Sequence, residues 1–225
     1  MAALEVQNAN VQADTHVYLG NLKVKIATRF GLFLLLLAVM LFATAGTLQY
    51  WEAWGYLAVI LLATFSIISY FYRRDPELLE RRMRMKEKEQ RQQLFMKISI
   101  PIFLMAYLIP GFDRRYGWSD VSFALIVISD VVILAAYYLF ALVLRENRYA
   151  SRVIEVADEQ HVVTTGPYAI VRHPMYVAAT LINLFSPLAL GSYVALAVAT
   201  LLPLFLVMRI LNEEEVLKRE LHGYT

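Results

Sequence analysis

Long apolar runs alternate with polar segments along this chain. A helix rises 1.5 Å per residue, so about 20 apolar residues cross a hydrocarbon core of roughly 30 Å. The runs cover residues 30–48, 54–72, 94–109, 121–144, 175–190 and 193–211. The pattern therefore predicts an all-α fold, a multi-pass integral membrane helical bundle with about six spans. The third run is the weakest of them, because it is short and carries Pro101 and Pro110.

The last two runs predict a tight helical hairpin. They meet at Gly191 and Ser192 with almost no connecting loop. Since the two arms have similar lengths, their free ends, residues 172–176 and 209–215, should lie close together.

Lysine and arginine indicate the orientation. If the amino terminus is cytoplasmic, 19 of the 21 basic residues fall on that side, and only Arg114 and Arg115 fall on the other. Basic residues resist translocation and accumulate in cytoplasmic loops. We therefore expect the polar ends of the hairpin to face the cytoplasm. On the outer side an interfacial aromatic belt is expected from Trp51, Trp54, Tyr56, Tyr116 and Trp118.

The polar segments divide the chain into three parts. Residues 1–29 form an expected cytoplasmic amino-terminal segment. Residues 30–144 hold four spans and a basic cytoplasmic loop at 73–97. Residues 145–225 hold a long polar loop, the hairpin and a cytoplasmic carboxyl-terminal segment.

Composition agrees with a membrane protein and narrows the chemistry. The chain of 225 residues is 59% hydrophobic and 18% charged, whereas soluble domains carry more charge. A net charge of +2 without a basic repeat argues against nucleic-acid binding. Absence of cysteine excludes disulfides, thiolate nucleophiles and Cys-based metal sites. The four histidines lack metal-ligand spacing, so we expect no metal site.

Loop 73–97 contains a helix-start signal, Asp75 followed by Pro76. Leu78, Leu79 and Met83 would share one face of the resulting short helix. We expect a surface helix that anchors on anionic lipid headgroups.

Two polar clusters are candidates for chemistry. The first ends the long loop 145–174 with Gly166-Pro167-Tyr168 and then Arg172-His173-Pro174-Met175-Tyr176. Proline suits the first turn of a helix, whose free N–H groups can bind an anion. Alternatively, these side chains only contact lipid headgroups at the membrane edge.

The second cluster follows the last run and contains Glu213, Glu214 and Glu215. Carboxylates at the carbonyl end of a helix oppose its dipole, so we expect an offsetting partner. Either Arg209 pairs with Glu213 four residues on, or Glu213 or Glu214 turns back toward His173.

One acid lies inside a span. Asp130 is near the middle of the fourth run, where an acid is costly and should face the bundle interior. Asn183 in the fifth run is a possible hydrogen-bond partner.

Residues 147–224 resemble the isoprenylcysteine carboxyl methyltransferases and their bacterial relatives, which include phospholipid methyltransferases. The resemblance rests on ordered motifs together with the hairpin, and residues 75–83 also resemble the bacterial branch. The motifs are Val163-Thr164-Thr165-Gly166-Pro167-Tyr168, Arg172-His173-Pro174-Met175-Tyr176, and Arg209 followed by Glu213-Glu214. Family members continue past Tyr224 with a further tail, so we expect pocket closure to differ here.

The resemblance implies an S-adenosylmethionine site on the cytoplasmic side of a membrane, here expected to be a bacterial cytoplasmic membrane. A lipid or prenylated acceptor, small molecule or protein, would enter from the bilayer. The resemblance implies that Arg209 holds the acceptor. If the acceptor were an amine, a nearby carboxylate would have to take up the proton, and Glu213 could do that, so Arg209 and Glu213 are the candidate catalytic residues. The resemblance also implies a cofactor site lined by Gln160, His161, Val162, Val163, Tyr168, His173, Pro174, Tyr176 and Glu214.

Three alternatives stay open from the sequence. They are a phospholipid N-methyltransferase, a nicotinamide-dependent membrane reductase of the sterol type, and a non-catalytic membrane scaffold. Carboxyl methylation of a prenylated cysteine or a similar lipid is the activity that the resemblance favours.

Overall fold

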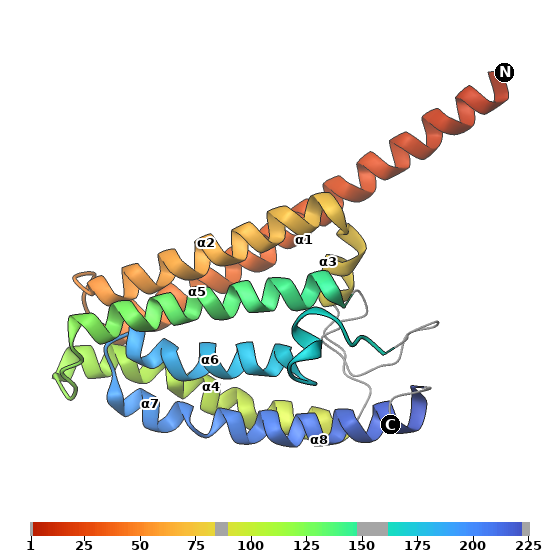
Figure 1. The fold of residues 1–225 in the computed structure, drawn as a ribbon. Coiled ribbons are helices and arrows are strands. Elements are labelled where there is room, and N and C mark those ends of the chain that lie inside the picture. Colours follow the sequence, from red (N-terminus) through yellow and green to blue (C-terminus); the bar gives the residue numbers. More distant parts are fainter. Residues whose placement is uncertain (1, 84–89, 148–161, 222–225) are drawn as a thin grey trace.

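The computed structural model describes residues 2–83, 90–147 and 162–221 (Figure 1). These residues form helices and no strands, which confirms the all-α fold class. In chain order the elements are α1 (Ala2–Ala45), α2 (Trp51–Arg74), α3 (Pro76–Arg82), α4 (Gln90–Tyr116), α5 (Phe123–Glu146), the 3₁₀ helix η1 (Gly166–Ala169), α6 (Pro174–Ala189), α7 (Tyr193–Ala199) and α8 (Leu202–Glu220).

Four stretches among the described residues are long and apolar enough to cross a membrane. They are Leu19–Ala45, Trp51–Arg74, Phe123–Glu146 and Tyr193–Arg219. Helix α6 is apolar but has 16 residues, and α4 has 27 residues with charged side chains toward both ends. Both run alongside the other helices in the bundle (Figure 1). The six expected runs therefore correspond to four clear spans and two further helical passes.

The ends of two predicted runs were wrong. Helix α1 begins at Ala2, far ahead of residue 30, and ends at Ala45 because Gly46 turns the chain with a φ of 67°. The third run, expected at 94–109, is the longer helix α4, which accommodates both prolines. Run length and hydropathy therefore predicted which segments pass through the bundle, but not the residues at which the helices begin and end.

The sixth run is not one continuous helix. It divides into α7 and α8 at residues 200–201, and Pro203 lies in the first turn of α8. Proline has no N–H to donate to the carbonyl one turn back, so a helix tends to break and restart there. The hairpin itself is confirmed: Gly191 has a φ of 74°, and the Ser192 hydroxyl caps α7 by accepting from the Ala195 N–H at 3.0 Å.

The bundle core contains a buried hydrogen-bonded cluster that was not predicted from the sequence. The Tyr56 hydroxyl lies 3.0 Å from the Tyr107 hydroxyl and 2.8 Å from Ser186 Oγ, so it joins α2, α4 and α6. Tyr56 is fully buried, and its expected place in the outer aromatic belt was wrong. Trp51, Trp54, Tyr116 and Trp118 are exposed, as a belt requires.

The possible hydrogen bond between Asn183 and Asp130 is not formed. Asp130 is on α5, and its Oδ1 is buried without a hydrogen-bond partner among the described residues. Its carboxyl group faces α2, since a Cβ built on Gly55 would lie 3.9 Å from Asp130 Oδ2. The absence of a side chain at Gly55 makes room for the carboxyl group on that side.

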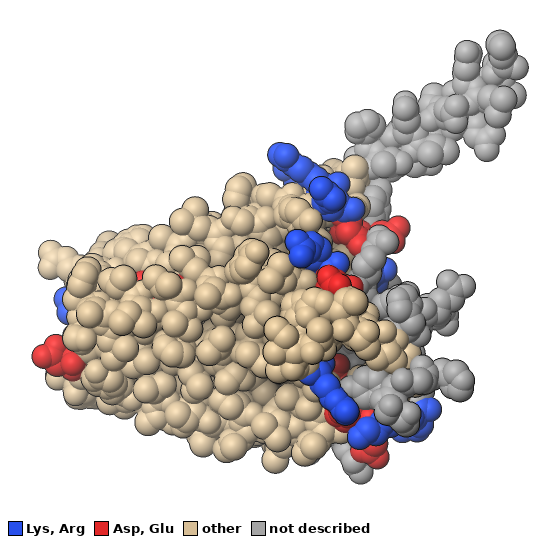
Figure 2. Space-filling view, in the orientation of Figure 1, with Lys and Arg blue, Asp and Glu red and all other residues tan. Residues whose placement is uncertain are grey.

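Charged side chains gather at one end of the bundle (Figure 2). This end carries the carboxyl ends of α2, α5 and α8 and the amino end of α6 (Figure 1). Between the two ends the visible surface is almost free of charge, as contact with lipid requires.

The charged end is expected to face the cytoplasm, and thiol labelling tests this. With no native cysteine, Tyr116→Cys at the opposite end should react with an impermeant reagent in intact cells. Glu77→Cys, an exposed position on α3, should react only after permeabilisation. Labelling of Glu77→Cys but not Tyr116→Cys in intact cells would reverse the orientation.

Candidate active site at the charged end of the bundle

The amino end of α6 and the carboxyl half of α8 meet through His173 and Glu214. His173 Nε2 lies 2.8 Å from Glu214 Oε1, across 41 residues of sequence. Glu214 Oε2 also lies 3.3 Å from Lys218 Nζ and 3.9 Å from Arg172 Nη1. The structure thus brings the two ends of the hairpin together, and Glu214 turns back toward His173.

The three glutamates do not lie at a helix end. Helix α8 continues to Glu220, past the expected end at residue 211, and its last turn carries Lys218 and Arg219. Basic residues there suit the helix dipole. The glutamates therefore need no partner to offset the helix dipole, because the helix end carries Lys218 and Arg219 instead.

Tyr176 lies between Arg209 and Glu213. Its hydroxyl donates to Glu213 Oε2 at 2.5 Å and accepts from Arg209 Nε at 3.0 Å. The expected Arg209–Glu213 pair is thus bridged by a tyrosine from the facing helix. This arrangement fixes the guanidinium group and the carboxylate relative to the first turn of α6.

Helix η1 is held against the end of α5 by residues that the sequence reasoning missed. The Thr165 hydroxyl donates to Glu146 Oε1, and Asn147 Nδ2 donates to the Tyr168 hydroxyl at 3.0 Å. Gly166 has a φ of 57°, and a Cβ there would lie 3.0 Å from the Glu146 side chain. The only signal was indirect: a polar Glu146-Asn147 pair directly after the fourth run.

The Tyr168 hydroxyl is kept protonated. Burial raises the pKa of Tyr168 above its ordinary value, and the negative charge of Glu213 acts in the same direction. The hydrogen bond from Asn147 and the charge of Arg82 lower the pKa in part. Tyr168 therefore contributes a neutral hydroxyl within electrostatic reach of both α8 and α3.

Helix α3 packs its apolar face against other helices of the protein instead of against the lipid surface. The Asp75 side chain caps it by accepting from the Leu78 N–H at 3.0 Å, which confirms the helix-start signal. Leu78 and Leu79 are buried in a cluster with Phe71 and Leu144. The expected lipid anchor was wrong for these two leucines, because they pack against α2 and α5.

Three of the remaining predicted residues lie within the described part of the chain. Val162 and Val163 are half-buried in the irregular segment before η1. Pro174 is buried in the first turn of α6. Gln160 and His161 lie outside the described residues. The described part of the chain contains no cluster of three His, Asp or Glu side chains that could hold a metal ion.

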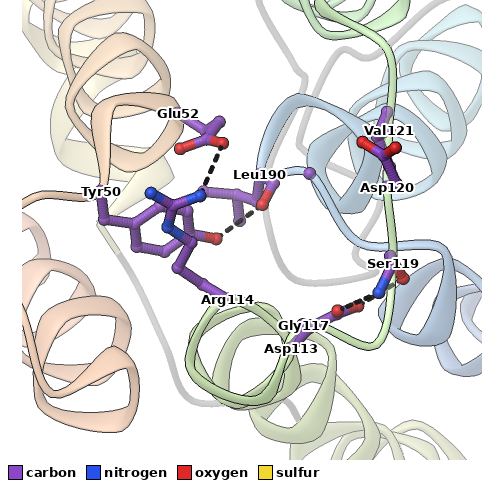
Figure 3. A pocket seen from close by; sticks show the side chains of 10 residues that line it. Tyr50, Glu52, Asp113, Arg114, Gly117, Ser119, Asp120, Val121 and Leu190 are labelled. Atoms are coloured by element: carbon purple, nitrogen blue, oxygen red, sulfur yellow. Dashed lines mark hydrogen bonds and ion pairs between the residues drawn. The ribbon is translucent and has the colours of Figure 1, made fainter.

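A polar pocket of about 110 Å³ lies at the end of the bundle opposite the candidate site. Figure 3 shows the side chains that line it. Its polar groups mostly bind one another: the Tyr50 hydroxyl donates to the Leu190 carbonyl at 2.6 Å, and Arg114 lies 3.7 Å from Glu52. Asp113 accepts from the Ser119 N–H at 2.7 Å and from the Ser192 hydroxyl. These contacts join the loops at this end of the bundle to the hairpin turn, which is a structural role.

The fold and the site define a multi-pass helical membrane protein with a polar centre between the two ends of its last hairpin. Residues 125–219 match the Isoprenylcysteine carboxyl methyltransferase (ICMT) family. This confirms the family resemblance for the carboxyl-terminal part of the chain, which contains the polar centre except α3. The match indicates a membrane methyltransferase. No curated protein and no solved structure matches the chain.

Proposed function

We propose that this protein is an S-adenosylmethionine-dependent methyltransferase whose acceptor is a lipid-bearing carboxylate, such as that of a prenylated cysteine. The observation that carries the proposal is the junction of α6 and α8. There His173 is hydrogen-bonded to Glu214, and Tyr176 is hydrogen-bonded to Arg209 and Glu213. The rings of His173 and Tyr176 lie 5.8 Å apart, so the two groups are neighbours within the family segment.

The residues present fit the donor chemically. S-adenosylmethionine carries a sulfonium, an ammonium and a carboxylate, and it supplies an activated methyl group when bound. Glu214 offers negative charge, while the positive dipole end of α6 suits a carboxylate. We assign Gln160, His161, Val162, Val163, Tyr168, His173, Pro174, Tyr176 and Glu214 to this site.

The reaction needs alignment more than acid or base catalysis. A carboxylate oxygen attacks the methyl carbon, an O–C bond forms, and the C–S bond breaks with its electron pair passing to sulfur. The products are a methyl ester and a neutral thioether, and no proton is released. Holding both reactants in line can supply about 7–11 kcal/mol of the barrier reduction.

Arg209 is assigned to the acceptor. A guanidinium group can bind both oxygens of a carboxylate in parallel, which also directs them. Tyr176 fixes the Arg209 side chain by accepting from its Nε. Arg209 therefore presents its charge in a defined direction beside the first turn of α6.

An amine acceptor is the second candidate, and one contact favours it. Methyl transfer to an amine releases a proton, so a base is required. Glu213 is the carboxylate beside Tyr176 and Arg209, with Oε2 accepting from the Tyr176 hydroxyl at 2.5 Å, and it would take up that proton. A phospholipid amine would then replace the carboxylate as the acceptor.

Calorimetry with purified protein in detergent tests the proposal. We expect saturable binding of S-adenosylmethionine and of its demethylated product, and no binding of reduced nicotinamide nucleotides. Binding of a nicotinamide nucleotide alone would indicate a reductase. Absence of binding by all three compounds would indicate a non-catalytic scaffold.

A further inference from the structure

Helix α3 delivers a second arginine to the candidate site from outside the family segment. We propose that Arg82 is an acceptor-binding residue, which holds the anionic group of the acceptor together with Arg209. The inference rests on the proposed function. It adds a specificity determinant from the amino-terminal half of the chain, whereas the family match begins at residue 125.

The backbone of α3 is fixed at both ends, so the direction of Arg82 is defined. Asp75 caps the first turn, and Leu78 is fully buried. At the other end, Arg29 Nη1 of α1 donates to the Met83 carbonyl at 2.7 Å. Two earlier helices thus hold the short helix against the end of the bundle.

The Arg82 side chain points toward the start of α6. Its guanidinium carbon lies 5.1 Å from the centre of the Phe140 ring on α5. Its Nη1 lies 3.5 Å from Met175 Sδ, one residue before Tyr176. Its positive charge also acts on the Tyr168 hydroxyl. Arg82 is therefore held beside the first turn of α6 and within electrostatic reach of Tyr168.

The charges around these tyrosines favour an anionic acceptor. Arg82 acts on Tyr168 from α3, and Arg209 contacts Tyr176 from α8. Of the described acids, Glu213 acts on both tyrosines, and Glu146 is bound to Thr165 ahead of Tyr168. Glu214 has its own neighbours, His173 and the cations Lys218 and Arg172. At the edge of a membrane these charges are less screened than in water, so a carboxylate gains from the second guanidinium group.

A pair of probes that differ only in charge tests the inference. The first is S-farnesylated N-acetylcysteine, and the second is its neutral carboxamide. Direct binding to purified protein in detergent is measured without the methyl donor. Arg82→Gln should weaken binding of the carboxylate about tenfold, the loss of a charge-assisted hydrogen bond, and leave the carboxamide within about twofold.

Two further variants separate charge from structure. Arg82→Lys retains the charge and should recover part of the carboxylate affinity. Arg74→Gln is the matched control, because Arg74 also lies over an aromatic ring, that of Tyr70, but is exposed and away from the site. It should change neither affinity by more than about twofold.

The outcomes are distinct. Equal weakening of both probes by Arg82→Gln would assign Arg82 a purely structural role and overturn the inference. Unchanged carboxylate binding, or no carboxylate binding by the unaltered protein, would overturn it as well. The proposed function is tested by a different measurement: it would be contradicted if the unaltered protein did not bind S-adenosylmethionine.

Discussion

Glu214→Gln is expected to weaken S-adenosylmethionine binding about tenfold to a hundredfold, from loss of a charge-assisted interaction of roughly 1.5–3 kcal/mol. The substitution removes the negative charge proposed to face the donor. It also weakens the 2.8 Å contact with His173 and leaves Arg172 and Lys218 without their common anion. Titration calorimetry with purified protein measures the change.

Arg209→Lys is expected to fail differently. Lysine retains the positive charge but loses the planar fork, so donor binding should remain while turnover on a carboxylate acceptor falls. Equal weakening of donor binding by both substitutions would place Arg209 in the cofactor site. Normal donor binding by both, with only lower stability, would mean that the two residues serve the helix junction alone.

Glu215→Gln is the matched control for the first variant. Glu215 is exposed, and it lies one residue beyond Glu214 on the same helix. The variant removes the same charge from the same turn, so donor affinity should stay close to that of the unaltered protein. A large effect of Glu215→Gln would indicate a long-range charge effect rather than a specific role for Glu214.

The features of the fold that were predicted correctly each depend on one strong sequence pattern. Apolar runs identified the passes through the bundle, and Gly191-Ser192 identified the hairpin turn. The ends of the helices were not predicted, because hydropathy measures apolarity and not whether the backbone stays helical. Polar residues extend α1 and α8 beyond the apolar runs, and Pro203 interrupts an otherwise apolar run. Tyr56 was misplaced because a tyrosine can be buried wherever its hydroxyl finds partners, here Tyr107 and Ser186.

The site was predictable in part for a similar reason. A tight hairpin forces its two free ends together, so the meeting of His173 with Glu214 followed from connectivity. The bridging role of Tyr176 did not follow, because spacing on one helix cannot show a side chain inserted from another. Glu146, Asn147 and Arg82 were missed because they reach the site from α5 and α3, whose positions depend on long-range packing.

Gly111→Ala should strongly destabilise the protein by forcing α1 and α4 apart. A Cβ at residue 111 would lie 1.8 Å from Thr44 Oγ1 and 2.7 Å from the Leu41 carbonyl oxygen. Thr44 cannot easily move, since its hydroxyl donates to the Met40 carbonyl at 2.6 Å. Membrane helices approach closely through small residues, and overpacking such a contact costs about 1–3 kcal/mol. The backbone clash places this variant at the upper end of that range.

Thermal unfolding in detergent, followed by circular dichroism, measures this effect. Gly31→Ala is the control, because a Cβ at that position in α1 meets nothing within 4 Å. It should be neutral or stabilise the helix by up to about 1 kcal/mol. Adding Thr44→Ala to Gly111→Ala should restore only part of the stability, since the contact with the Leu41 carbonyl remains. Similar unfolding temperatures for Gly111→Ala and Gly31→Ala would show that α1 and α4 do not pack as closely as the structure places them.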